Sequence, residues 1–165
     1  MIIEENCKVY LLRKYKSLLE DYMNVDEMKR IKALLFQATN EKDGSLIEEY
    51  LAEKIKWHDG CDGNNGSDVI FEWPKRDFIN ANILGIGSFE KTKTIILQIA
   101  EGDKVFTLFT VEGIHDTGEI WDYPPTGKKI RYNAQYTARF ENGLIVEMWA
   151  TMDGHTVMKQ LGIVK

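Results

Sequence analysis

The sequence predicts an α+β fold in which helices come first and an antiparallel sheet follows. In the first half of the chain, apolar residues recur at three- and four-residue intervals, the spacing of helices that bury one side. In the second half, four segments are rich in β-branched and aromatic residues. The turn signals Glu101-Gly102-Asp103 and Asn142-Gly143 separate two pairs of these segments. Helices followed by a strand meander are typical of the α+β class.

Three helices are predicted before residue 52. The first covers residues 9–23, and the second follows the candidate N-cap Asp26 and carries its apolar stripe through Ala38. The third begins at Ser45, with Glu48 three residues later in a capping-box pattern. A short strand over residues 55–59 is expected next.

The middle of the chain is predicted to be irregular. Residues 59–68 are crowded with Gly, Asn and Asp, which favours a loop. A helix is expected to begin near Pro74 and to run through Phe78 and Ile79, because proline suits a first helical turn. Strands are then predicted over residues 92–99, 104–115, 130–140 and 144–152.

The Asn142-Gly143 loop predicts a register for the last two strands. A two-residue loop places Glu141 opposite Leu144, and an unbroken count puts Tyr136 opposite Trp149 and Tyr132 opposite Asp153. One face is therefore predicted to be aromatic, to end in an acid and to be covered by the helices. The other face mixes Thr, Gln and Asn with Val and Met, which suits solvent or a second subunit.

The composition is that of one soluble globular domain. The 165 residues are 44% apolar and 28% charged, and the net charge is −5. Basic residues such as Lys29, Arg30 and Lys32 are interleaved with apolar and acidic ones, so we interpret them as a solvated helix face and expect no nucleic-acid partner. Without a leader pattern or a long apolar run, the chain is expected to be cytoplasmic, off the membrane, with Cys7 and Cys61 as reduced thiols.

Several short motifs together point to a known family. They are Gly113-x-His115, the Pro-Pro-Thr-Gly of residues 124–127, the Arg-Phe-Glu-x-Gly of 139–143, the Ile-Val-Glu-x-Trp of 145–149, Asp153, the Gln-Leu-Gly of 160–162 and, upstream, Trp57-His58-Asp59. On these residues the chain resembles the SnoaL-like polyketide cyclases of the nuclear-transport-factor-2-like superfamily. The resemblance covers residues 103–164 and, more weakly, 26–59. Residues 1–25 are expected to form an additional helix before a single domain of residues 26–165.

The resemblance implies a cone-shaped fold, in which N-terminal helices pack on a strongly curved antiparallel sheet that encloses an apolar pocket. It also implies a homodimer formed through the outer sheet face. Family cyclases close a polyketide ring by an intramolecular aldol step without metal or cofactor, and an acid on a late strand moves the proton. Asp153 is the best match to that acid, and His115 and His58 match histidines that commonly line the pocket. Many relatives carry Asp directly after the conserved Trp, where this chain has Ala150.

Asp153 has two interpretations. Between aromatic walls its carboxylate would be poorly solvated, which raises the pKa toward that of a general base. Tyr132, Tyr136, His58 and His115 would then be the available donors to the enolate. Alternatively, Asp153 caps a short helix over residues 154–162.

Two functions are therefore open. The first is a cofactor-independent enzyme that acts on a small hydrophobic carbonyl compound by aldol-type cyclisation or isomerisation. The second is a non-catalytic module that binds an apolar ligand, which Ala150 favours. The predicted catalytic residues are Asp153, His115 and His58, and the predicted substrate-binding residues are Tyr132, Tyr136, Trp149, Trp57 and Trp121. No ligand pair has the spacing of a metal site, so no metal is expected.

Overall fold

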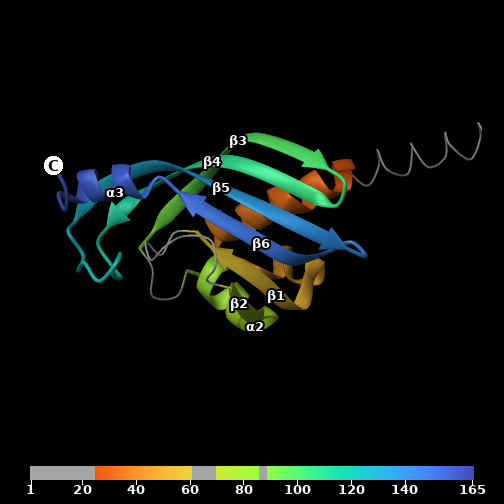
Figure 1. The fold of residues 1–165 in the computed structure, drawn as a ribbon. Coiled ribbons are helices and arrows are strands. Elements are labelled where there is room, and N and C mark those ends of the chain that lie inside the picture. Colours follow the sequence, from red (N-terminus) through yellow and green to blue (C-terminus); the bar gives the residue numbers. More distant parts are fainter. Residues whose placement is uncertain (1–24, 61–69, 86–88) are drawn as a thin grey trace, which may run out of the picture.

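A computed structural model describes residues 25–60, 70–85 and 89–165 (Figure 1). The helical elements are a helix over residues 25–41, the short helices η1 (Gly44–Leu46), η2 (Glu48–Tyr50), α2 (Lys75–Phe78) and η3 (Ile79–Ile83), and the C-terminal α3 (Gly154–Leu161). The strands are β1 (Leu51–Asp59), β2 (Ile70–Pro74), β3 (Lys91–Glu101), β4 (Lys104–His115), β5 (Lys128–Glu141) and β6 (Leu144–Met152). The predicted helix over 9–23 and both cysteines lie outside the described residues.

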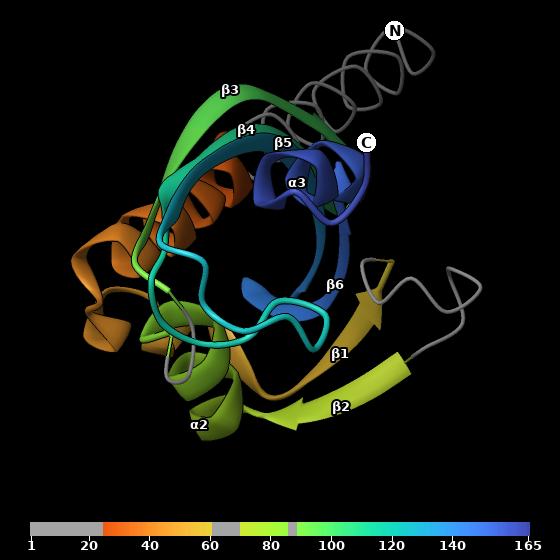
Figure 2. The ribbon, with the colours of Figure 1, turned by 90° about the vertical axis from the view of Figure 1, so that its left-hand side faces the viewer.

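The six strands form one sheet in the order β2-β1-β6-β5-β4-β3. In Figure 2 this sheet curls into an open arc, and the 25–41 helix and α2 lie across its open side. The predicted curved α+β cone is therefore confirmed. One pairing differs from the expected antiparallel pattern, because β1 runs parallel to β6. The long connection between these two strands makes a parallel pairing possible.

The sequence patterns located most elements well. Strands β4 and β6 have the predicted bounds, and the helix after Pro74 is present as α2 and η3. Strand β2 was not predicted. The third helix is only two 3₁₀ turns, and its cap is Asp43 rather than Ser45, because the Asp43 carboxylate accepts the Ser45 backbone N–H at 2.9 Å.

The main core fills the space between the 25–41 helix and the concave face of the sheet. Its buried members include Met28, Ile31, Leu35, Ile55, Trp57, Phe78, Ala138, Met148 and Ala150. A smaller cluster joins α3 to β5 through Ile130, Val157 and Leu161. The convex face of the sheet carries polar and charged side chains around Glu147 on β6 and exposed apolar side chains on β3.

A β-bulge changes the register of the β5–β6 hairpin. Phe140 pairs with Ile145 as predicted, but Arg139 then pairs with Glu147, so Val146 is an extra residue. Beyond the bulge Tyr136 faces Ala150 instead of Trp149. The prediction that Trp149 and Asp153 share a face with Tyr136 and Tyr132 is therefore wrong, because the count assumed an unbroken ladder.

Within the described part of the chain, no helix is long and apolar enough to cross a bilayer.

Candidate functional site

A small cavity lies between the helices and the concave face of the sheet. It encloses about 240 Å³ of empty space, counting the part open to solvent, and its free centre of about 10 Å³ has room for about one water molecule. Its lining residues are Leu35, Phe36, Thr39, Trp57, Phe78, Asn82, Ile83, Lys93, Tyr136 and Met148. The wall is thus apolar and aromatic with a few polar groups, which is the usual character of a small-molecule site.

Lys93 brings an amine into this cavity from the edge strand β3. Its side chain is buried, whereas the neighbouring Thr92 and Thr94 are exposed, because alternate strand residues point to opposite faces. The Asn40 side chain fixes this position through two bonds: its Nδ2 donates to the Lys93 carbonyl (2.9 Å) and its Oδ1 accepts the Lys93 N–H (2.8 Å). The Lys93 Nζ lies 5.2 Å from the centre of the Tyr136 ring.

Lys32 is a second buried amine close to the same ring. Its side chain is fully buried, and its Nζ has no hydrogen-bond partner among the described residues. That Nζ lies 5.4 Å from the centre of the Tyr136 ring and 5.8 Å from that of Phe36. The interpretation of Lys32 as part of a solvated helix face is wrong. Its spacing of four residues from Met28 and from Phe36 places it in the buried stripe, and this spacing was the signal available in the sequence.

Burial changes the acid–base properties of both amines. Desolvation, helped by the charge of Lys91, lowers the pKa of Lys93 from 10.5 to about 7. Desolvation and the charge of Lys93 hold the pKa of Lys32 well below its ordinary value. A large fraction of the Lys93 side chains are therefore neutral at physiological pH. A neutral amine can accept a proton or attack a carbonyl carbon.

Asp153 lies outside this cavity and caps α3. Its side chain is exposed and accepts hydrogen bonds from the Thr156 backbone N–H (3.0 Å) and hydroxyl (2.6 Å). These hydrogen bonds, from the Thr156 hydroxyl first, lower the pKa of Asp153. The predicted desolvated carboxylate with a raised pKa is therefore wrong, and the capping interpretation is confirmed. Its role as acid and base stays a prediction that this geometry does not support.

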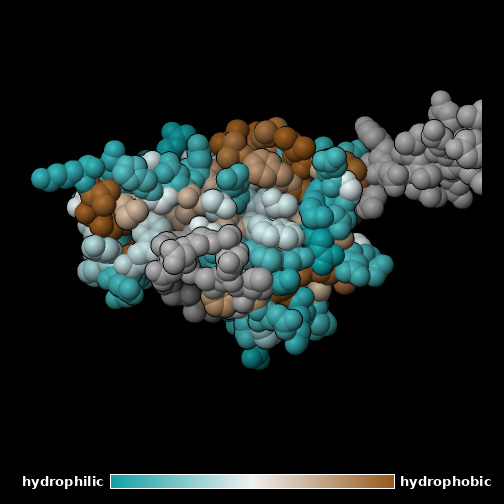
Figure 3. All heavy atoms as spheres, in the orientation of Figure 1, coloured by the Kyte–Doolittle hydropathy of each residue, from teal (hydrophilic) through white to brown (hydrophobic). Residues whose placement is uncertain are grey.

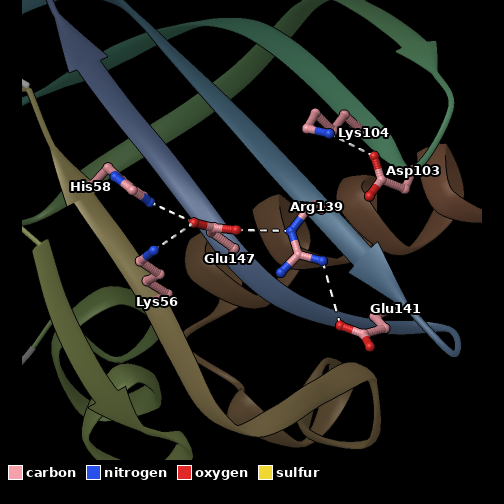
Figure 4. Close-up of polar contacts among 7 residues, drawn as sticks. All are labelled: Lys56, His58, Asp103, Lys104, Arg139, Glu141 and Glu147. Carbon is pink, nitrogen blue, oxygen red and sulfur yellow. Dashed lines mark hydrogen bonds and ion pairs between the residues drawn. The ribbon is translucent and has the colours of Figure 1, made fainter.

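His58 belongs to a polar cluster on the convex face (Figure 4). Its Nε2 lies 2.6 Å from one Glu147 oxygen, and the Arg139 Nε donates to the other oxygen at 2.8 Å. Burial alone would raise the pKa of Glu147, but the hydrogen bonds from His58 and Arg139 and the charge of Lys56 outweigh it and lower that pKa to about 2. The expected pocket position of His58 is wrong, because neighbouring Trp57 points into the cavity and His58 points away from it.

His115 is fully buried at the far end of β4, and it does not line the cavity. Its Nε2 donates to the Gly118 carbonyl (3.1 Å), and its Nδ1 lies 3.2 Å from the Thr126 hydroxyl. Both ring nitrogens are thus engaged with the β4–β5 connection. This arrangement fits a residue that holds the loop, and it leaves no ring nitrogen directed at the cavity.

The predicted substrate-binding residues lie in three places. Trp57 and Tyr136 line the cavity, and their rings meet edge to face at 5.6 Å. Trp149 stacks on His58 on the convex face, with ring centres 4.7 Å apart. Tyr132 and Trp121 pack against the α3 cluster. Only Trp57 and Tyr136 of these residues line the cavity, although Tyr132 also packs with Tyr136 against the cluster of Phe36, Phe109, Val111 and Ala134. The sequence patterns did not single out Lys93 or Lys32.

Comparison with known proteins identifies the family. The SnoaL-like polyketide cyclase family profile matches residues 29–161, and the chain belongs to this family. IdmH of Streptomyces antibioticus, a candidate polyketide cyclase, is 26% identical with a TM-score of 0.65, over 81% of this chain and 97% of its own. AclR of Streptomyces galilaeus, a candidate hydroxylase, is 23% identical with a TM-score of 0.66, over 86% of this chain and 99% of its own.

A third similar structure is a candidate polyketide cyclase from Acidithiobacillus ferrooxidans. It is 21% identical to this chain with a TM-score of 0.67, over 84% of this chain and 96% of its own. No functionally curated protein matches the chain. The resemblance inferred from the sequence motifs is confirmed at the level of family and fold.

Proposed function

We propose that this chain is a cofactor-independent SnoaL-like enzyme that acts on a small hydrophobic carbonyl compound by acid/base chemistry, through aldol-type cyclisation or isomerisation. The observation that carries the proposal is the cavity, whose apolar and aromatic wall holds the Lys93 amine. Membership of the family and the likeness to IdmH support this reaction class. A ligand larger than water requires movable side chains such as Lys93 and Met148 to change rotamer.

The first step of both reactions is removal of a proton from the carbon next to a carbonyl. The neutral Lys93 amine is the group in the cavity that is suited to accept this proton, because a base works best when its pKa lies near the working pH. The resulting ammonium can return the proton to another atom of the same substrate. Asn82 also lines the cavity, and its amide is a candidate donor to the enolate oxygen.

Proton exchange in deuterated water tests this proposal. Small cyclic and aromatic ketones are incubated with the protein, and NMR follows the loss of the proton next to the carbonyl. Wild type should accelerate exchange, and Lys93→Met should reduce the acceleration by about 100-fold or more. Lys129→Met removes an exposed lysine of β5 and should leave the rate unchanged. Loss of exchange in Asp153→Asn, with Lys93→Met fully active, would return the role of base to Asp153.

A non-catalytic binding protein is the second candidate. The observation that favours it is that, among the described residues, no carboxylate or imidazole lines the cavity. In that case a ketone would broaden or shift the Tyr136 and Trp57 signals without exchanging its proton in any variant. Binding without exchange would thus separate this function from the first.

We also propose that the chain forms a homodimer through the outer sheet face. Ile96, Leu97 and Ile99 of β3 are 54%, 45% and 55% exposed, and Figure 3 shows an apolar patch in this region. Exposed apolar patches commonly mark protein contacts. Light scattering should give twice the chain mass, and Ile99→Lys should reduce it to a monomer. A monomeric wild type at working concentration would remove the proposal.

A further inference from the structure

We propose that Lys93 is a covalent site, at which its Nζ condenses with the carbonyl carbon of a small apolar aldehyde or ketone to form an imine. This inference rests on the proposed function, since it concerns the same cavity and the same class of ligand. It goes further by making the amine a nucleophile that bonds to the ligand. The observations that carry it are the position of the amine, the absence of an ion-pairing carboxylate among the described residues and the apolar, aromatic wall.

The position of Lys93 is suited to attack on a ligand. The amine reaches the cavity from one wall, while Trp57 and Met148 belong to the opposite strands β1 and β6. The backbone of Lys93 is held by both polar atoms of Asn40, so the base of the side chain is fixed and only its flexible stem can move. A ligand seated against Trp57 and Met148 would therefore present its carbonyl toward the Nζ.

The amine is buried without a carboxylate partner in the part of the chain that the structure describes. Buried lysines are normally paired with a carboxylate, because burial of a lone charge is costly. In the described ranges no carboxylate forms an ion pair with Lys93 or Lys32, and the Lys32 Nζ has no hydrogen-bond partner. Two amines without a carboxylate partner thus lie beside one aromatic ring, and one of them, Lys93, lines the cavity. Structural stability alone would favour an apolar residue at either position.

The reaction balances without any oxidant or reductant. The neutral amine adds to the carbonyl carbon, and the π electrons of the carbonyl move to its oxygen. One proton passes from nitrogen to oxygen to give a carbinolamine. The nitrogen lone pair then forms the C=N bond while the C–O bond breaks, and the hydroxyl takes up the second N–H proton and leaves as water, so that amine and carbonyl become imine and water. Protonation of the imine nitrogen makes the adjacent C–H more acidic, which provides the electron sink that an aldol or isomerisation step needs.

The Tyr136 ring can stabilise the positive charge that develops in this sequence. The Lys93 and Lys32 nitrogens lie 5.2 and 5.4 Å from the ring centre, within the range of cation–π contacts. A protonated imine at Lys93 would keep its charge close to the same ring. The Lys32 amine lies beside the same ring but does not line the cavity, so no step of the reaction is assigned to it.

Reductive trapping tests the inference on the whole 165-residue chain. Benzaldehyde is added at neutral pH with sodium cyanoborohydride, which reduces an imine to a stable secondary amine. Mass spectrometry of the intact chain and of its peptides then locates the benzyl group. Wild type and Lys129→Met should carry one benzyl group at Lys93, and Lys93→Met should carry none above the level of its surface lysines. Circular dichroism establishes that the variant is folded.

Three results would overturn the inference. They are no adduct on folded wild type, an adduct of the same yield in Lys93→Met, or an adduct located at Lys32. The proton-exchange assay keeps the two proposals apart. Exchange that depends on Lys93 without a trapped adduct would leave Lys93 as a base and remove the imine, whereas loss of both signals would remove the proposed function as well.

Discussion

The stability of the protein should rise with pH because of Lys93. In the unfolded chain this amine has its ordinary pKa of 10.5, and in the folded chain its pKa is about 7. Between these values the unfolded state binds one more proton, so the free energy of unfolding increases with pH. The lowered pKa of Lys93 reduces the free energy of unfolding by about 4 kcal/mol at pH 7 and by about 2 kcal/mol at pH 9, relative to an amine with an unchanged pKa. Lys93→Met keeps the apolar stem and removes this cost.

Urea unfolding of wild type and Lys93→Met at pH 7 and pH 9 measures the effect. The variant should be more stable than wild type at pH 7, and its advantage should shrink by about 2 kcal/mol at pH 9. Lys129→Met controls for loss of an exposed lysine and should follow wild type at both values. The reasoning is refuted if the difference between Lys93→Met and wild type is the same at both pH values, because the amine would then titrate alike in both states.

Three further outcomes are expected. Glu147→Gln should lower the free energy of unfolding by up to about 3 kcal/mol at pH 7 and by little near pH 2, since the carboxylate contributes above pH 4.5 and loses its contribution as the pH falls through about 2. Urea unfolding measures this, with Glu119→Gln, at an exposed glutamate of the β4–β5 connection, as the control. Asp153→Ala should lower the melting temperature more than Asp153→Asn, which keeps an acceptor for Thr156, and neither should slow ketone exchange. His115→Phe should lower the free energy of unfolding by about 1–3 kcal/mol, because the hydrogen bonds to the β4–β5 connection are lost, and it should keep ketone proton exchange. A variant that is stable but inactive in exchange would contradict the structural role of His115.

Local patterns sufficed for most of the fold. The Asn142-Gly143 signal and the β-branched runs located β4 and β6, because strand alternation and turn chemistry are properties of neighbouring residues. The parallel contact between β1 and β6 could not be predicted in the same way. It joins segments about ninety residues apart, and it depends on how the curved sheet closes around the helices.

The site was harder to predict than the fold. The register count failed at Val146, because a bulge depends on the twist of the whole sheet and has no firm sequence signal here. The charge of Lys32 predicts an exposed side chain, whereas its helical spacing from Met28 and Phe36 predicts a buried one, and the spacing proved correct. Lys93 was overlooked because β3 reverses the usual pattern, with lysines inward and Ile96, Leu97 and Ile99 outward. The family resemblance predicts a pocket position for Asp153, but its side chain is exposed and caps α3.

The bulge at Val146 also determines which side chains of β6 point into the core. It makes position 150 an inward position that faces Tyr136, and the residue there, Ala150, is buried in the main core. This is the position at which the family resemblance places an aspartate in many relatives. A side chain at position 150 of β6 therefore points into the core next to Tyr136, whereas Lys93 enters the cavity from β3. Ala150→Asp would place a carboxylic acid on β6 facing Tyr136 with no change in chain length, so a single substitution separates this chain from the acid that the family resemblance places there.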